Sequence, residues 1–186
     1  MLYTLPQTRN PAIPARAAAV AAFAALTALS ARVTIETGGP VPFTLQVLPS
    51  ILAGLVLGWR DGALSQIAYV AMIAIGLPLD ARAIGAASLG GPTAGFLIGF
   101  IPTAAVAGGL AQISGASLWM RWLAGAYALF VLYVFGVAWL AVTLRIPPNV
   151  AFNAVDGYIG FDLAKAFLAA GLAETGRAWL GRGTGA

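Results

Sequence analysis

Long apolar stretches separated by short polar segments run through almost the whole chain. A helix that crosses a bilayer needs about 20 mostly apolar residues. By that measure the pattern predicts six transmembrane helices, over about residues 12–33, 45–59, 62–77, 93–114, 119–144 and 158–180. The chain is therefore expected to be all-α, with residues 1–186 forming one membrane domain.

Turn-forming residues define the boundaries between these spans. Residues 38–42 read Gly-Gly-Pro-Val-Pro and precede the second span, and residues 59–62 form a tight polar turn that joins the second and third spans. Gly90-Gly91-Pro92 precedes the fourth span, in which Pro102 predicts a kink. Residues 145–149 contain two consecutive prolines and cannot continue a helix.

The arginines indicate how the chain is oriented. Six spans put both termini on one side, and the arginines assigned to that side outnumber the others: Arg9, Arg16, Arg60, Arg121, Arg177 and Arg182 against Arg32, Arg82 and Arg145. The positive-inside rule then predicts cytoplasmic termini. The long loops, about residues 34–44, 78–91 and 145–157, all lie on the outer side, and long loops on a rigid scaffold usually bind something.

Composition supports the membrane class and excludes much chemistry. Hydrophobic residues make up 60% of the chain and charged residues only 9%, against about 25% charged in soluble domains. With no Cys and no His, the usual zinc, haem and iron–sulfur sites, disulfides and Ser-His or Cys-His catalysis are excluded, and we expect no catalytic residues, metal or cofactor. The cations are scattered rather than clustered, so nucleic acid is not an expected partner.

Two ionisable residues stand out within the sixth apolar span. Asp162 and Lys165 are three residues apart and share a helix face. Charged groups at membrane depth cost about 2.5–3.5 kcal/mol each and tend to be paired and functional. A carboxylate that accepts and an ammonium that donates would suit a polar ligand with adjacent donors and acceptors, whereas the alternative is a purely structural pair.

Two other segments carry candidate features. Thr44 is a candidate N-cap for the second span, and Gln46 lies in an apolar run where its amide needs a partner. In the first span, Ala17, Ala21 and Ala25 form a stripe of small residues at four-residue spacing. Such a stripe permits close helix packing, either against a partner or within the chain.

Several ordered motifs between about residues 40 and 170 resemble the signature series of the BioY family. They are Val41-Pro42-Phe43-Thr44-Leu45-Gln46, Leu52-Ala53-Gly54, Leu57-Gly58, Gly62-Ala63-Leu64-Ser65, Gly76-Leu77-Pro78, Gly91-Pro92-Thr93-Ala94-Gly95-Phe96, Gly99-Phe100 and Asp162-Leu163-Ala164-Lys165. That family comprises the biotin-capturing S components of energy-coupling factor (ECF) transporters.

The resemblance implies a six-helix S-component bundle in the bacterial cytoplasmic membrane that captures biotin from outside. It implies as partners a transmembrane T component, which would dock on the alanine stripe, and two cytoplasmic ATPases. Asp162 and Lys165 match the family's acid-x-x-lysine motif. The chain departs from the family pattern in the outer loop of about residues 78–91, where Ser88 is the candidate polar contact, and before Asp162, where Gly160-Phe161 replaces the usual Pro-Gly.

If the ligand is biotin, the first hypothesis places its ureido ring on Asp162 and Lys165. Asp162 would accept an N–H of the ureido ring, Lys165 would donate to its carbonyl, and Phe43 and Tyr158 would cover the rings. Arg82 or backbone N–H groups of the loop would meet the carboxylate nearer the surface. The reverse orientation, with Lys165 on the carboxylate, remains an alternative.

Three alternatives for the function stay open at the level of sequence. One is the capture of another vitamin, and a second is transport of biotin without the ECF module, alone or as a homo-oligomer. An intramembrane enzyme, with Asp162 as base and Thr44 or Ser88 as nucleophile, has no visible supporting partner.

Overall fold

The computed structural model describes residues 13–113 and 117–182, the last six by backbone only. Its elements in chain order are α1 (Ile13–Ser30), β1 (Thr34–Ile35), β2 (Phe43–Thr44), α2 (Val47–Ala74), the 3-10 helix η1 (Gly85–Gly90), α3 (Ala94–Ile113), α4 (Leu118–Leu144), α5 (Pro148–Asn153), the 3-10 helix η2 (Asp156–Tyr158) and α6 (Ile159–Arg182). The fold is mostly helical, as the sequence predicts.

Helices α1, α3, α4 and α6 coincide closely with four of the predicted spans, and α2 covers the other two. The backbone leaves the helical conformation inside α2 at Gly58, where φ is 83° and ψ is 176°. A Cβ placed on Gly62 would lie 2.8 Å from the Cα of Gly54, so the chain folds back here into two helices. The turn predicted at residues 59–62 is wrong in position, because the reversal uses the positive φ that glycine tolerates at residue 58.

A small antiparallel ribbon is the feature that the all-α prediction misses. Thr34 pairs with Thr44 and Ile35 with Phe43, which joins the two ends of the first outer loop. The two strands are only two residues long, too short for the alternation that identifies a strand in sequence. The ribbon fixes Phe43 and Thr44 directly before α2.

The outer surface of the bundle is apolar, as a lipid-facing surface requires. Four of the described helices, α1 to α4, are long and apolar enough to cross a membrane. Large exposed side chains such as Leu29, Trp119, Phe130, Val142 and Leu172 cover the outside. In α6 the described part is less apolar, because it carries Asp162, Lys165 and Glu174.

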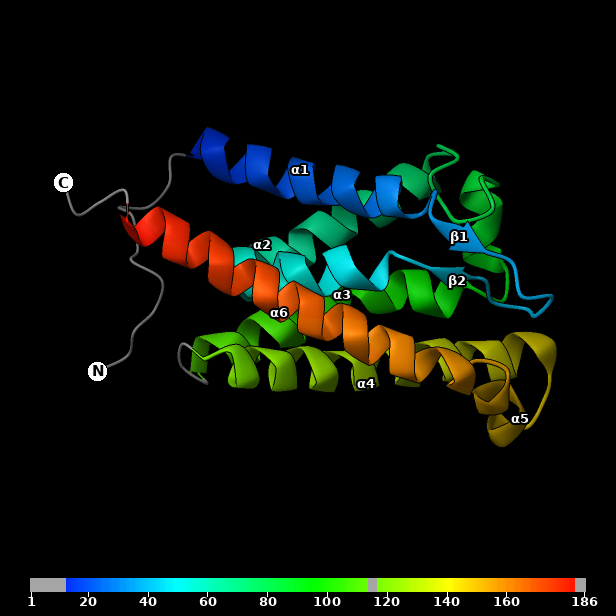
Figure 1. Ribbon diagram of the computed structural model, residues 1–186. Coiled ribbons are helices and arrows are strands. Elements are labelled where there is room, and N and C mark those ends of the chain that lie inside the picture. Colours follow the sequence, from blue (N-terminus) through cyan, green and yellow to red (C-terminus); the bar gives the residue numbers. More distant parts are fainter. Residues whose placement is uncertain (1–12, 114–116, 183–186) are drawn as a thin grey trace.

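Loops and helix ends are segregated to the two ends of the bundle (Figure 1). The start of α1 and the end of α6 lie at one end, and the ribbon, η1 and α5 lie at the other. This arrangement agrees with an even number of crossings and gathers the three long loops together. Two ion pairs, Arg16 with Asp61 (2.6 Å) and Arg121 with Glu174, involve arginines assigned to the cytoplasmic side. Arg9 lies outside the described residues, as do the side chains of Arg177 and Arg182.

Glycines let α2 and α3 pack backbone to backbone. A Cβ on Gly54 would lie 2.2 Å from the carbonyl oxygen of Ala104, and one on Gly108 would lie 2.5 Å from the nitrogen of Trp59. Neither position has room for a methyl group. The close approach holds the first residues of both helices, which border the site described next, in a fixed relation.

Candidate ligand-binding site

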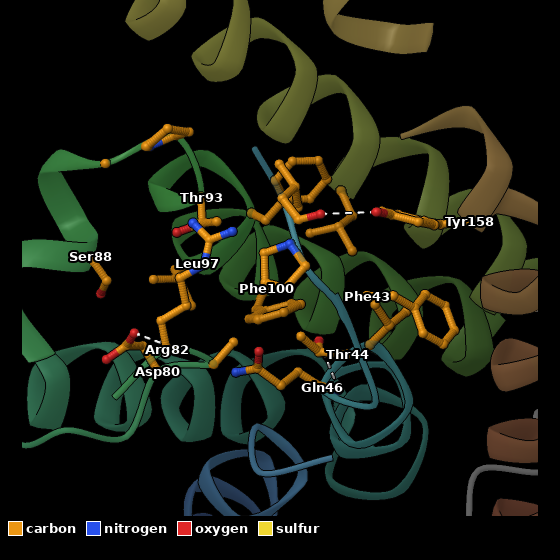
Figure 2. Close-up of a pocket in the computed structure, with 18 of the residues that line it drawn as sticks. Phe43, Thr44, Gln46, Asp80, Arg82, Ser88, Thr93, Leu97, Phe100 and Tyr158 are labelled. Atoms are coloured by element: carbon orange, nitrogen blue, oxygen red, sulfur yellow. Dashed lines mark hydrogen bonds between the residues drawn. The ribbon is translucent and has the colours of Figure 1, made fainter. Parts of the chain in front are cut away.

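A cavity opens at the end of the bundle that carries the long loops (Figure 2). It encloses about 790 Å³ of space between atoms, including the part open to solvent. Its walls come from residues 41–47, from the loop and 3-10 helix of residues 80–92, and from α3, α4 and α6. Its polar side chains are Thr44, Gln46, Asp80, Arg82, Ser88, Thr93, Tyr133, Tyr158 and Asp162.

Asp162 lines the cavity and forms a buried ion pair with Lys165, one turn further along α6. The Lys165 Nζ lies 2.6 Å from Asp162 Oδ1, and the two residues are only 6% and 5% exposed. The Tyr133 hydroxyl donates to the second carboxylate oxygen, Oδ2, at 2.8 Å. Each oxygen has a second lone pair, so Asp162 retains capacity to accept from a ligand.

Lys165 makes two further contacts within the chain. Its Nζ also donates to the Thr44 carbonyl oxygen at 2.6 Å and lies 3.6 Å from the centre of the Phe43 ring, a cation–π contact. Lys165 is not among the residues that line the cavity. The structural pair that the sequence leaves as an alternative is therefore present, and one of its two members faces the ligand space.

Aromatic rings form one wall of the cavity entrance. The Phe43 ring lies 5.4 Å from that of Tyr158 and 5.6 Å from that of Phe161, centre to centre. The Tyr158 hydroxyl is 2.6 Å from Thr37 Oγ1 and donates to the Val41 carbonyl at 3.0 Å. These contacts tie the first outer loop to the start of α6.

Thr44 and Gln46 both line the cavity, but the predicted capping role of Thr44 is wrong. Thr44 belongs to β2, and the residue at the N-cap of α2 is Gln46, with no capping bond from its side chain. The Thr44 hydroxyl instead accepts from the Gln46 backbone N–H at 3.4 Å. The partner that the Gln46 amide requires is Tyr69, which the sequence pattern does not single out.

Arg82 reaches from the second outer loop to the first. Its guanidinium donates to both carboxylate oxygens of Glu36 at 3.1 Å and to the carbonyl of Gly39 at 3.3 Å. The hydrogen bonds from Arg82 hold the pKa of the Glu36 carboxyl below its usual range. In this state the cation expected to meet a ligand carboxylate is occupied by a carboxylate of the chain itself.

The second outer loop is organised by Asp80, a cavity residue that sequence reasoning did not select. Its carboxylate accepts the backbone N–H of Arg82 at 3.1 Å and of Gly85 at 2.7 Å. Ser88 follows in η1, is buried, and donates to the Gly85 carbonyl at 2.7 Å. The structure thus places Ser88 in the cavity wall, as expected.

Two further cavity residues, Thr93 and Tyr133, were also missed. Thr93 precedes α3, and Tyr133 lies on α4 with its ring 6.1 Å from that of Phe96. Thr93 belongs to a motif that is visible in the sequence, whereas Tyr133 sits in an apolar span with no pattern to distinguish it. Only the fold brings Tyr133 to Asp162.

The alanine stripe of α1 faces away from the rest of the chain. Ala17, Ala21 and Ala25 are exposed, while Ala24 and Ala28 on another face of α1 are buried. The interpretation of this stripe as an intramolecular packing face is wrong. Small residues facing lipid leave a shallow surface that a partner helix can approach closely.

Together these features define a multi-pass helical membrane protein with a ligand cavity at one end. The described residues contain no cluster of acidic side chains suited to a metal ion. The sequence model of the BioY family matches residues 7–182, and the chain belongs to this family.

Individual relatives agree with this assignment. The chain is 37% identical over 142 residues to the biotin transporter BioY of Rhizobium etli, covering 70% of this chain and 75% of the relative. It is 39% identical to the biotin transporter BioY of Thermotoga maritima, covering 71% and 78%. A probable biotin transporter BioY of Pyrococcus horikoshii is 40% identical, over 77% of this chain and 85% of the relative.

A solved structure shares the fold. The crystal structure of the S component for biotin from an ECF-type ABC transporter superposes with a TM-score of 0.81 at 25% identity, covering 89% of this chain and 92% of that one. The predicted S-component bundle is confirmed by this match. The chain belongs to a family of transporters, and the alternative of an intramembrane enzyme is dropped.

Proposed function

We propose that this protein captures biotin at the outer end of its bundle and carries it across the membrane as the S component of an ECF-type transporter. Membership of the BioY family carries the proposal, since the relatives in Rhizobium etli and Thermotoga maritima are biotin transporters. The cavity supports it independently, because a mostly apolar pocket with a few convergent polar groups suits a fused ring system bearing a urea.

In the proposed binding mode the urea end of biotin lies against Asp162. Asp162 accepts a ureido N–H, and Lys165, released from one of its internal contacts, donates to the ureido carbonyl. Phe43 and Tyr158 supply the aromatic cover. Lys165 would have to gain access past Phe43, whose ring now lies over the ammonium, so binding in this mode includes a small movement of the first outer loop.

At the other end of the ligand, the carboxylate of biotin would displace the Glu36 carboxylate from Arg82. We expect Arg82→Gln to weaken biotin binding but not binding of the neutral biotin amide, and Glu36→Gln to strengthen biotin binding. Both changes should be no larger than about fivefold, because exposed ion pairs contribute little. The measurement is the Kd of each ligand for the purified variants.

Acidification offers a second test of the same exchange. Since the pKa of Glu36 is lowered by Arg82, the pair is intact at neutral pH and is lost only as the pH falls through that lowered value. The advantage of Glu36→Gln should therefore shrink in acid.

A near-total loss of biotin amide binding to the wild type, with Arg82→Gln harmless, would instead favour the reverse orientation.

For the partners, we propose a transmembrane T component docked on the stripe of Ala17, Ala21 and Ala25, with two cytoplasmic ATPases supplying the energy. An ECF-type transporter contains an energy-coupling module, and the stripe is exposed and free of bulky side chains. Ala21→Leu should abolish co-purification with a co-expressed module because the added side chain blocks close helix approach.

The matched control for this variant is Ala138→Leu, which enlarges an exposed alanine of α4. Both variants should bind biotin like the wild type. Co-purification that survives Ala21→Leu, or that fails equally in Ala138→Leu, would contradict docking on the stripe.

Uptake in cells tests the function itself. Bacteria that lack their own biotin uptake and express this chain with an energy-coupling module should accumulate labelled biotin, and unlabelled biotin should compete whereas thiamine and riboflavin should not. Competition by one of these other vitamins would transfer the proposal to that substrate. Equal uptake with and without the module would support a transporter that works alone.

A further inference from the structure

Three hydrogen-bonding groups form a chain from the cavity to the second outer loop. Gln46, only 3% exposed, donates from its side-chain Nε2 to the hydroxyl of Tyr69, and this hydroxyl donates to the backbone carbonyl of Leu79 at 3.1 Å. Tyr69 is fully buried in the second half of α2. Its ring contributes nothing to the cavity surface, so Tyr69 can act on a ligand only through its neighbours.

The polarity of this chain is fixed at its far end. A carbonyl oxygen only accepts hydrogen bonds, so the single proton of the Tyr69 hydroxyl must point to Leu79. The Tyr69 oxygen is then left as an acceptor, and the Gln46 amide must turn its NH₂ toward it. The usual ambiguity in the orientation of a glutamine amide is thereby removed, and the amide oxygen Oε1 has to face the other way.

The Gln46 amide oxygen is unused within the protein. No described residue donates a hydrogen bond to it. In the described part of the chain, every fully buried side-chain oxygen or nitrogen has a hydrogen-bond partner. The Gln46 oxygen, which has none, is therefore not fully buried. Gln46 lines the cavity, and Figure 2 shows its side chain beside Thr44 at the cavity wall. The oxygen is therefore an acceptor that a ligand can reach.

We propose that Tyr69 is a positioning residue that fixes Gln46 as a hydrogen-bond acceptor for an N–H group of the ligand. The inference rests on the proposed function, because the ligand it addresses is biotin, whose ureido ring has two N–H groups. Asp162 accepts one of them and Gln46 Oε1 accepts the other. A ligand that carries a hydrogen-bond acceptor in place of the second N–H would face the acceptor oxygen of Gln46 and be rejected. This makes Tyr69 a determinant of specificity.

The same chain of bonds couples the ligand to the outer loops. Leu79 directly precedes Asp80, whose carboxylate organises the loop that carries Arg82. A ligand bound to Gln46 strengthens the polarisation of the Gln46–Tyr69–Leu79 chain, so it also stabilises the loop segment at Leu79. Tyr69 thus connects recognition of the urea to the loop that forms part of the cavity wall.

The test compares biotin with its two mono-N-methyl derivatives at the ureido ring, in wild type, Tyr69→Phe, Gln46→Leu and the double variant. For one derivative, the ratio of its Kd to that of biotin should fall about fivefold in Tyr69→Phe, the size expected for one neutral hydrogen bond. The ratio falls because Tyr69→Phe removes a hydrogen bond from bound biotin but none from the derivative, whose methylated nitrogen has no N–H to donate. The steric cost of the methyl group is the same in all variants and cancels when their ratios are compared.

Gln46→Leu should lower the same ratio by as much, and the double variant should lower it no further. The matched control is Tyr127→Phe, a change at an exposed tyrosine of α4 that should leave both ratios unchanged. A merely structural role for Tyr69 would alter stability and leave the ratio at its wild-type value. An unchanged ratio in Tyr69→Phe, with a lowered ratio in Gln46→Leu, overturns the proposal.

A second measurement needs no ligand. In protein labelled with ¹⁵N-glutamine, the side-chain NH₂ of Gln46, identified by its loss in Gln46→Leu, should exchange slowly with solvent in the wild type and much faster in Tyr69→Phe. Equal exchange rates overturn the positioning role. Wild-type protein that binds no biotin contradicts the proposed function, and in that case the exchange rates alone decide whether Tyr69 holds Gln46.

Discussion

Asp162→Asn should reduce biotin affinity by about two orders of magnitude. The change leaves the Lys165 ammonium buried without its counter-charge and replaces one of the two acceptor oxygens at the cavity wall by an NH₂ group, which can only donate. Truncating one partner of a buried, hydrogen-bonded charge pair costs about 2–5 kcal/mol. The measurement is the Kd for biotin of detergent-purified protein, together with its unfolding temperature.

A double variant separates the two roles of this pair. Asp162→Asn with Lys165→Met removes both charges, and replacing a buried ion pair by neutral groups is often harmless to stability. We expect the double variant to unfold near the wild-type temperature and still to bind biotin poorly. Near-normal binding by the double variant would show that the pair is structural only.

Gly54→Ala should have the largest effect on stability. The new methyl carbon would lie 2.2 Å from the carbonyl oxygen of Ala104 and 2.9 Å from the nitrogen of Gly108. Both atoms belong to the backbone of α3, so no side chain can rotate away, and the two helices must separate. Overpacking of this kind costs about 1–3 kcal/mol or more, which lowers the unfolding temperature by several degrees in a chain of this size.

Gly109→Ala provides the matched control on α3. Outside the helix's own backbone, the atom nearest to a Cβ there is the Cβ of Trp59 at 4.0 Å, an ordinary contact, and alanine favours a helix more than glycine does. This variant should be as stable as the wild type or slightly more stable. If both alanines were tolerated equally, the backbone contact between α2 and α3 would not be as close as the fold requires.

The sequence predicts the framework of the fold well because apolar runs and turn residues are local signals. Helices α1, α3, α4 and α6 agree with their predicted spans within a few residues. The sequence predicts the reversal inside α2 at residues 59–62, but the polar side chains there do not make the turn. The backbone freedom of Gly58 does, and composition alone does not reveal which glycine adopts a positive φ.

The site was predicted in part, and the missing part depends on contacts between distant segments. Asp162, Gln46 and Thr44 were found because polar groups in apolar runs are conspicuous, and the cavity includes all three. The sequence does not single out Tyr69 and Tyr133, because a tyrosine in an apolar helix is ordinary. Their roles come from Gln46 and Asp162, which lie 23 and 29 residues away along the chain. The pairing of Arg82 with Glu36 likewise forms only when two loops meet.

Equilibrium binding of labelled biotin to the purified wild-type protein is the most direct test of the account. We predict one biotin per chain, displaced by unlabelled biotin but not by thiamine or riboflavin, with the affinity lowered about a hundredfold in Asp162→Asn. Well-folded protein that retains no biotin, or that retains another vitamin in its place, would contradict the assignment of this cavity to biotin.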